Sequence, residues 1–301
     1  MSDAPDLPEP DRLPGLPHPR ETPRLFGQET AERAFLDALA ARRVPHAWLL
    51  RGPEGVGKAT LAYRMARAVI AGEAEAPEAG LLGAPEPLAT LDAPAGCPVA
   101  RRIRAGYEMR LHVPRRPRSA TRKTLRVGIS IEQIRDLKED FTYAVPDGGW
   151  RAVIVDAADE MTTQATNSFL KLLEEPPPET LLILVAHQPG RLLPTIRSRC
   201  RALDLKPLGP DPLARAMEQA TGEAPDADEA ATVAALAQGS VGRALRLAEG
   251  GGLALYGEIC ATLEGGGVER AAMMRLAEKA AARGAEERFA LTVELMALLA
   301  A

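Results

Sequence analysis

Residues 46–72 read HAWLLRGPEGVGKATLAYRMARAVIAG, an order that indicates a strand, a glycine-rich loop and a helix in succession. The apolar run at its start is typical of a buried strand, and apolar residues recur at helical spacing after the loop. Glycines let successive backbone N–H groups point at phosphate oxygens, and the start of a helix adds partial positive charge. The segment therefore predicts a phosphate-binding P-loop, with a cradle formed by Gly52, Gly55, Gly57 and Lys58.

The residue after the P-loop lysine departs from the pattern of hydrolysing P-loop proteins. Those proteins place a Ser or Thr hydroxyl on Mg²⁺ at this position, whereas this chain has Ala59. Thr60 comes one residue too late, because the next residue of a helix points about 100° away. We therefore expect the loop to lack its metal-binding hydroxyl.

A second apolar run, WRAVIV at 150–155, leads to a matching expectation. Asp156 stands where an acidic side chain holds Mg²⁺ in P-loop NTPases, but Ala157 stands where a glutamate would orient the attacking water. We interpret Asp159 and Glu160 as helix-end or surface carboxylates. The sequence thus predicts a vestigial site without hydrolysis and without a metal site, whose glycines and lysine are compatible with weak ATP or ADP binding.

Apolar runs and helical patterns alternate from residue 46 to about residue 206, which predicts a mostly parallel sheet covered on both faces. The predicted strands are 46–50, 150–155 and 181–186, and the predicted helices are 30–41, 59–72, 131–145 and 162–175. Ser130 and Gln133 have the spacing of a capping box at the start of one helix. Residues 73–126 lack clear periodicity, so we predict an irregular, partly basic insertion there.

The two ends of the chain differ from this α/β region. Residues 1–21 are rich in proline and poor in large apolar side chains, which predicts a disordered lead-in. Beyond Pro207 only helical patterns follow: short ones first, and longer alanine- and leucine-rich ones at 253–264 and 268–300. We therefore expect an α/β domain followed by two helical modules.

Composition favours a globular multidomain chain, with 301 residues, 46% hydrophobic residues, 26% charged residues and a net charge of −4. No apolar segment approaches the roughly 18 residues of a membrane span, and the N-terminus has no features of a secretory signal. Three cysteines (Cys97, Cys200 and Cys260) lie far apart, which is typical of a reducing cytosol and supports neither a disulfide framework nor a zinc site. We expect a cytoplasmic protein with no membrane contact.

These motifs together resemble those of a known family. The segment NSFLKLLEEPPPETLLILVAHQPGRLLPTIRSRC at 167–200 resembles the signature of bacterial AAA+ clamp-loader subunits, most closely their delta-prime branch. Three shorter boxes match as well, namely LFGQ at 25–28, GPEGVGKAT at 52–60 and IVDAAD at 154–159. The resemblance covers about residues 22–250, and its central segment is hard to obtain by chance.

The resemblance implies a fold in three parts. These are an α/β P-loop NTPase (AAA+) domain with a parallel sheet over 22–206, a small helical lid over 207–249, and a helical collar over 250–301. The collar is shorter than family members usually carry. The family's four zinc-ligand cysteines are represented only by Cys97, so we expect no zinc and no required cofactor.

The resemblance also implies a role in DNA replication. The chain would be a non-hydrolysing subunit of the DNA polymerase III clamp loader, assembled with tau/gamma and delta subunits. It would be grouped with DNA-directed DNA polymerase by complex membership alone. Arg199, within Ser198-Arg199-Cys200, matches the arginine that is presented across a subunit interface to ATP on a neighbouring motor subunit. Such a guanidinium is worth roughly 10³–10⁵ in rate.

Three further features carry weaker expectations. His187 is interpreted as a surface or interface histidine, and Arg243 lies one residue later than the family's nucleotide-contacting arginine. Residues 101–126 contain ten basic residues and only one acidic residue, Glu108. This segment would contact DNA phosphates, face an acidic neighbouring subunit, or form a solvated loop. Its basic residues are Arg101, Arg102, Arg104, Arg110, Arg115, Arg116, Arg118, Arg122, Lys123 and Arg126.

Two other functions remain open at this point. The first is an active ATPase motor of the tau/gamma type, in which Thr60 and either Asp159 or Glu160 rescue the site; Ala59 and Ala157 argue against it. The second is a nucleotide-binding regulator that never joins a clamp loader, which failure to assemble with tau/gamma and delta would favour.

Overall fold

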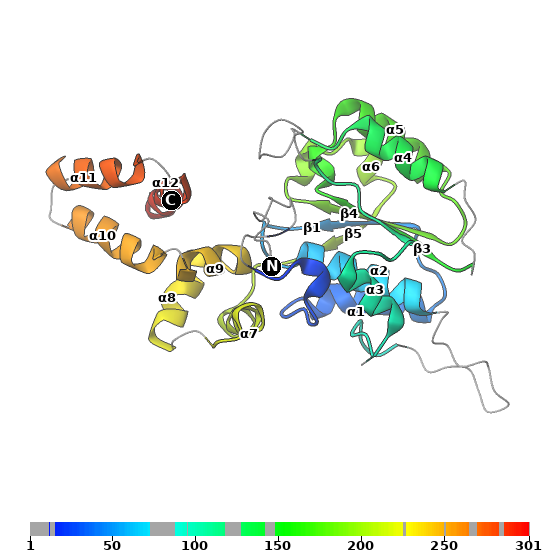
Figure 1. The fold of residues 1–301 in the computed structure, drawn as a ribbon, viewed down its shortest axis with the longest axis horizontal. Coiled ribbons are helices and arrows are strands. Elements are labelled where there is room, and N and C mark those ends of the chain that lie inside the picture. The colour runs from blue at the N-terminus through cyan, green and yellow to red at the C-terminus, as the bar shows by residue number, and fades with distance from the viewer. Residues whose placement is uncertain are drawn as a thin grey trace, which may run out of the picture. The chain divides into compact units, whose positions relative to one another are not determined.

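The chain divides into two compact units, Met1–Lys206 and Pro207–Ala301, which Figure 1 draws as a ribbon. The computed structural model describes residues 12, 16–72, 88–94, 96–117, 128–141, 148–224, 227–249, 251–264, 270–282 and 286–300. Among these residues, no helix is both long and apolar enough to cross a membrane.

The first unit is built on a five-stranded sheet in the order β2-β3-β4-β1-β5, and every neighbouring pair of strands is parallel. This confirms the α/β fold with a parallel sheet. The strands are β1 (Ala47–Arg51), β2 (Leu111–His112), β3 (Arg151–Asp156), β4 (Thr180–Ala186) and β5 (Arg201–Asp204). All seven residues of β4 are buried, as expected of a parallel strand covered on both faces.

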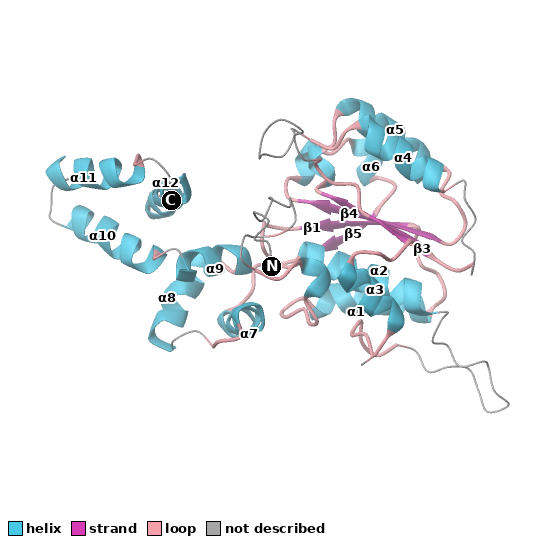
Figure 2. Cartoon of the chain, in the orientation of Figure 1, coloured by secondary structure: helices cyan, strands magenta, loops and turns pink. Residues whose placement is uncertain are grey.

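Helices cover both faces of the sheet, with α1, α2 and α3 on one side and α4, α5 and α6 on the other (Figure 2). The capping box at the start of α4 is confirmed, because the backbone N of Ser130 donates to Oε1 of Gln133 over 3.1 Å. The helices are α1 (Glu29–Ala40), α2 (Lys58–Gly72), α3 (Pro98–Ala105), α4 (Ile131–Asp140), α5 (Thr163–Glu174) and α6 (Pro194–Arg197).

The prediction of an irregular insertion over 73–126 is wrong for its central part, which contains α3 and the edge strand β2. Pro98 occupies the first turn of α3, where its missing N–H costs nothing. The thiol of Cys97 caps the helix by accepting from the N of Ala100 over 3.4 Å, and Gly106 ends it in a left-handed conformation. Arginines at the other positions of this short helix hid its apolar face in the sequence. Residues 73–87 and 118–127 lie outside the described residues.

The predicted disordered lead-in is also wrong where it can be checked, because residues 16–21 pack on the first unit. Pro19–Glu21 form a 3-10 turn, η1, in which Nδ1 of His18 accepts from the N of Arg20 over 3.1 Å. The His18 ring is buried and lies edge-on to Tyr63 of α2, with centroids 5.6 Å apart. Leu16, two residues earlier in the sequence, is also buried. Apolar and aromatic packing therefore orders this proline-rich segment. Apart from Arg12, residues 1–15 lie outside the described residues.

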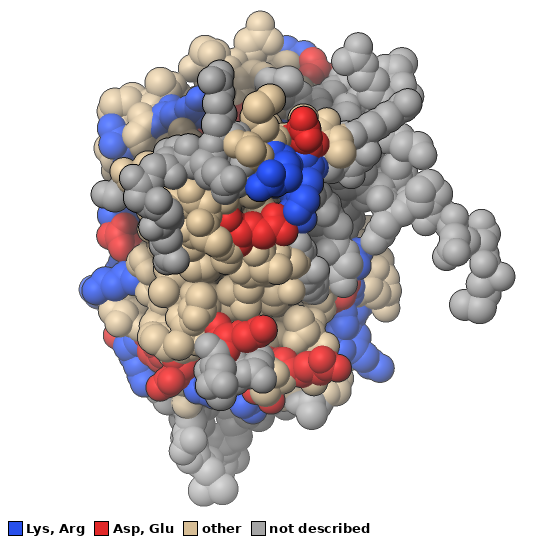
Figure 3. Space-filling view, turned by 90° about the vertical axis from the view of Figure 1, so that its left-hand side faces the viewer, with Lys and Arg blue, Asp and Glu red and all other residues tan. Residues whose placement is uncertain are grey.

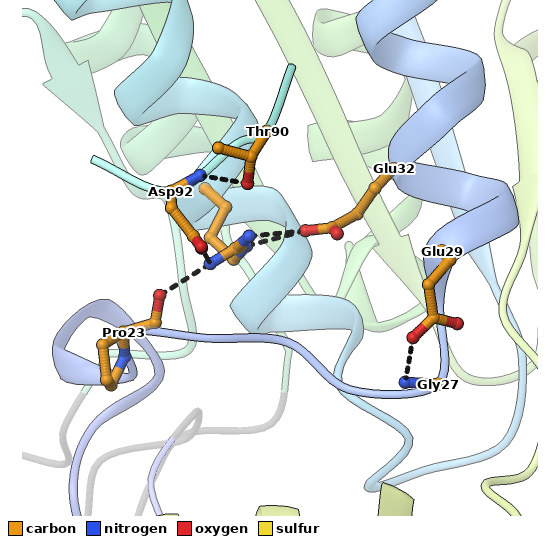
Figure 4. Close-up of polar contacts among 7 residues, drawn as sticks. Pro23, Gly27, Glu29, Glu32, Thr90 and Asp92 are labelled. Carbon is orange, nitrogen blue, oxygen red and sulfur yellow. Dashed lines mark hydrogen bonds and ion pairs between the residues drawn. The ribbon is translucent and has the colours of Figure 1, made fainter. Parts of the chain in front are cut away.

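An ion cluster centred on the buried Arg64 holds three parts of the first unit together. Arg64 of α2 is only 2% exposed, and its Nη2 lies 2.6 Å from Oε1 of Glu32 on α1. Its Nη1 lies 2.7 Å from Oδ1 of Asp92 and donates to the O of Pro23 over 2.6 Å. Figure 4 shows Glu32, Asp92 and Pro23 converging from three separate segments. The guanidinium thus fastens the N-terminal segment and residues 88–94 onto the helical layer.

The second unit is helical throughout its described residues, as predicted. The single helical pattern expected over 268–300 is in fact two helices, α11 and α12. On the face drawn in Figure 3, acidic and basic side chains are interspersed with uncharged ones. The helices are α7 (Pro210–Thr221), α8 (Ala227–Ala237), α9 (Val241–Glu249), α10 (Gly252–Glu264), α11 (Arg270–Ala280) and α12 (Glu286–Leu299).

Arg243 links two of these helices. Its guanidinium pairs with Glu294 of α12, and its Nη1 donates to Oε1 of Gln238 over 3.0 Å. The arginine that resembles a nucleotide-contacting residue in the sequence is therefore engaged by side chains of its own helical unit.

Candidate functional site

The predicted P-loop connects β1 to α2 with an unusual backbone. Gly52, Gly55 and Gly57 have φ values of +146°, +77° and +97°, which residues with side chains rarely adopt. Lys58 begins the helix, and its buried Nζ donates to the O of Gly52 over 2.8 Å and to the O of Pro53. The lysine therefore braces the curl of the loop from inside.

Two close approaches clamp this loop in place. A Cβ on Gly52 would lie 2.3 Å from the O of Leu205, and a Cβ on Gly57 would lie 2.5 Å from Cδ1 of Leu25. Neither contact leaves room for a side chain. The loop is thus held between the residues before α1 and the residues that follow β5.

Gln28 joins the same two segments by hydrogen bonds. Its buried Nε2 donates to the O of Val56 over 3.2 Å and to the O of Lys206 over 2.8 Å, while its Oε1 accepts from the N of Lys206 over 3.2 Å. Sequence reasoning identified Gln28 only as the end of the LFGQ box. Its position at the end of that box was the only available signal of this bracing role.

The charges of Asp156 and Lys58 interact at the carboxyl ends of the strands. Burial lowers the pKa of Lys58 to about 8, and the negative charges of Asp156, Glu54 and Asp159 partly offset that effect. Asp156 ends β3, and the P-loop follows β1. The predicted vestigial residues Asp156 and Lys58 therefore do share one site at the carboxyl edge of the parallel sheet, where ligands bind in such folds.

Asp159 and Glu160 are both committed to protein partners. Asp159 accepts from the backbone N of His187 over 3.2 Å and of Gln188 over 2.8 Å. Oε2 of Glu160 lies 2.8 Å from Nε of Arg116. Both residues lie in the 3-10 turn Ala158–Glu160, and both are partly buried rather than fully exposed on the surface.

His187 faces the cradle more closely than the sequence suggested. It follows β4, which lies between β1 and β3 in the sheet. Burial lowers the pKa of His187, and the positive charge of Lys58 lowers it further. The negative charges of Asp159 and Glu54 oppose these effects, so His187 lies within the electrostatic reach of Lys58 and of these carboxylates.

The residues at this edge offer a Mg²⁺ ion fewer ligands than the P-loop pattern requires. Ala59 has no oxygen, Asp159 accepts from two backbone N–H groups and Glu160 is paired with Arg116, while Asp156 stands where the pattern places a metal-binding carboxylate. Among the residues that the structure describes, no group of three or more His, Cys, Asp or Glu is arranged to hold a metal. The cradle can offer backbone N–H groups and cationic side chains to phosphate, but no metal cage.

Arg199 lies at the amino ends of the parallel strands, opposite the carboxyl ends where the P-loop lies. It precedes β5, whose first residue, Arg201, pairs with Trp48 near the start of β1. Its side chain is 37% exposed, with Nη2 2.9 Å from Oε1 of Glu174 and Nη1 donating to the O of Thr195 over 3.1 Å. Because the strands are parallel, the P-loop follows the other end of β1. Arg199 therefore cannot reach the P-loop of its own chain.

Much of the basic segment is paired internally where it is described. Arg102 and Arg110 both pair with the buried Glu108, at 2.8 Å and 3.2 Å. Although burial alone would raise it, hydrogen bonds from these two arginines hold the pKa of Glu108 below its usual value. Arg101 and Arg104 of α3 remain exposed. Fewer cations are thus available to a partner than the sequence suggests.

Comparison with known proteins shows that the α/β unit is similar to subunits of DNA polymerase III. Residues 27–209 match a family described as DNA polymerase III, delta subunit. The DNA polymerase III subunit delta' of Bacillus subtilis is 32% identical over 185 residues, covering 61% of this chain and 49% of that protein. The corresponding subunit of Pseudomonas aeruginosa is 36% identical over 155 residues, covering 52% and 41%.

A related subunit type also matches. DNA polymerase III subunit gamma/tau of Mycobacterium tuberculosis is 30% identical over 194 residues, which cover 64% of this chain and 30% of that protein. The matched segments thus span about half, or less, of the length of these relatives.

Proposed function

Because this chain belongs to the DNA polymerase III delta-subunit family, we propose that it serves as a delta-prime-like subunit of the bacterial clamp loader. In this role it hydrolyses no ATP itself. It assembles with tau/gamma and delta subunits and presents Arg199 to ATP bound on a neighbouring subunit while the sliding clamp is placed on primed DNA. Contact with DNA is made through the complex.

The position of Arg199 carries this proposal. The guanidinium is exposed, and its ion pair with the exposed Glu174 is of the surface type that contributes at most about 1 kcal/mol. A phosphate group can therefore replace that carboxylate at little cost. Arg199 precedes β5, whereas the P-loop follows the parallel neighbouring strand β1, so the two lie at opposite ends of these strands. This side chain is therefore suited to serve a site on another subunit.

The proposal that the chain itself hydrolyses no ATP is supported by the residues at the carboxyl ends of the strands. Water-orienting carboxylates and a metal-binding hydroxyl are the parts that phosphoryl transfer needs from the protein. Ala59 and Ala157 remove both, and the hydrogen bonds of Asp159 and the ion pair of Glu160 occupy the nearest substitutes. The same observations argue against an active ATPase motor of the tau/gamma type.

ATP turnover by the isolated chain and by a complex reconstituted with tau/gamma and delta tests the proposal. We expect an inert isolated chain and an active complex stimulated by clamp and primed DNA. Turnover that persists in Lys58→Ala measures contamination, because that variant removes the P-loop cation. Hydrolysis by the isolated chain that Lys58→Ala abolishes would make the chain a motor, and failure to assemble would favour the regulator.

Weak nucleotide binding to the cradle is expected to depend on pH through Lys58. Only protonated Lys58 attracts phosphate, and its pKa of about 8 means that the proton is lost within reach of ordinary buffers. Affinity for ADP should therefore fall as pH rises, by about tenfold between pH 7.5 and 9. Fluorescence titration with a labelled ADP measures this change. Lys58→Arg, whose guanidinium stays charged, should remove the dependence; a flat profile in the unmodified chain would contradict the assignment.

A further inference from the structure

The segment after β2 brings a second cation to the phosphate-binding edge of the sheet. The backbone N of Asp156, the last residue of β3, donates to the O of Pro114 over 3.4 Å. The O of Arg115 accepts a hydrogen bond from Gln133 of α4. Arg116 comes next, and its Nε lies 2.8 Å from Oε2 of Glu160. The basic insertion is thus anchored beside the end of β3.

Arg116 and Lys58 both act on the same histidine. The positive charges of Lys58 and Arg116 each help to lower the pKa of His187, after the larger effect of burial. His187 follows β4, and β4 separates β3 from β1. Two strand spacings of about 4.8 Å put the ends of β3 and β1 roughly 10 Å apart. Because the charges of Lys58 and Arg116 both act on His187, both cations lie near the end of β4, at the edge where a polyphosphate would bind.

We propose that Arg116 is a phosphate ligand of this site, so that the cradle binds the metal-free polyphosphate of a nucleotide. This inference rests on the proposed weak nucleotide binding and deepens it. Hydrolysing P-loop proteins neutralise the phosphates partly with Mg²⁺, an ion whose hydroxyl ligand is replaced here by Ala59. A guanidinium pairs with phosphate through two parallel hydrogen bonds and carries a permanent charge.

The ion pair between Arg116 and Glu160 is weak enough to leave the guanidinium available to a phosphate group. Arg116 and Glu160 are 31% and 33% exposed in their side chains, and ion pairs this close to solvent contribute little. Although the two charges are close, the contact lacks the geometry of a hydrogen bond, and the buried Nε has no hydrogen-bond partner among the described residues. Burial also raises the pKa of Glu160, although the charge of Arg116 opposes that effect.

The test is a fluorescence titration of the full chain with labelled ADP, once with EDTA and once with excess Mg²⁺. Binding with EDTA should be at least as tight as with Mg²⁺. Arg116→Ala should weaken it about tenfold or more, as for loss of a charged hydrogen bond. Glu160→Gln, which releases Arg116 and removes a competing charge, should tighten it several-fold. Arg101→Ala, an exposed arginine of α3, is the matched control and should change nothing.

Each contrary outcome overturns the inference. Binding that requires Mg²⁺ would show that a metal is held after all. Equal losses in Arg116→Ala and Arg101→Ala would show general charge attraction, and no detectable binding would show that the cradle is closed to nucleotide. A weakening by Glu160→Gln would show that the ion pair, rather than the arginine, matters. None of these results bears on Arg199, whose role is tested in the assembled complex.

Discussion

Replacing Arg199 by alanine is expected to lower ATP hydrolysis at the neighbouring subunit's site by about 10³-fold or more, while leaving the complex assembled. The reason is that a guanidinium placed against the charge of a transferring phosphoryl group contributes on that scale. Single-turnover hydrolysis measures the effect directly. The sharpest form uses complexes in which the P-loop lysines of the other motor subunits are replaced, so that only the site facing this chain remains active.

Two variants separate the role of Arg199 from a general surface effect. Arg197→Ala removes an exposed arginine at the end of α6, two residues before Arg199, and should leave turnover unchanged. Arg199→Lys keeps the charge but loses the planar fork, so it should restore only part of the rate. If Arg199→Ala and Arg197→Ala behave alike in assembled complexes, the chain does not supply a trans-acting arginine.

Replacing Arg64 by methionine is expected to lower the free energy of unfolding by about 1–3 kcal/mol. The substitution removes the hydrogen bond to Pro23 and leaves the carboxylates of Glu32 and Asp92 without the cation that they both contact, but both carboxylates keep some access to water, so the cost is smaller than for a fully buried unpaired charge. Denaturant unfolding followed by circular dichroism measures the change. Methionine fills similar volume, so the loss reports the charge and its hydrogen bonds more than a cavity.

The matched control and the double variant show whether the ion cluster is responsible. Arg33→Ala removes an exposed arginine of α1 and should change stability by no more than about 0.5 kcal/mol. Adding Glu32→Gln to Arg64→Met should recover part of the loss, because it removes the partly buried carboxylate left behind. A loss below about 1 kcal/mol in Arg64→Met would mean that the cluster does not hold the unit together.

Strong local patterns were sufficient to predict most of the fold. The run LLILVA is apolar at every position because β4 is buried on both faces, and such a run is recognisable without a partner. The prolines after Glu175 correctly marked the end of α5. Weak patterns failed in two places. Only one of the four residues of β5 is buried, and arginines mask the apolar face of α3.

By itself, the sequence determined the α/β class, the P-loop backbone and the loss of the metal-binding hydroxyl, because each depends on residues close together in the chain. Only the tertiary structure decided which charges meet. Asp159 reaches the end of β4, and Arg116 reaches Glu160. It likewise decided that Arg199 lies before β5, at the end of the sheet away from the P-loop of its own chain. Hydrophobic periodicity reveals which side of an element is buried, but the neighbours at a sheet edge follow from strand order, which joins segments far apart in sequence.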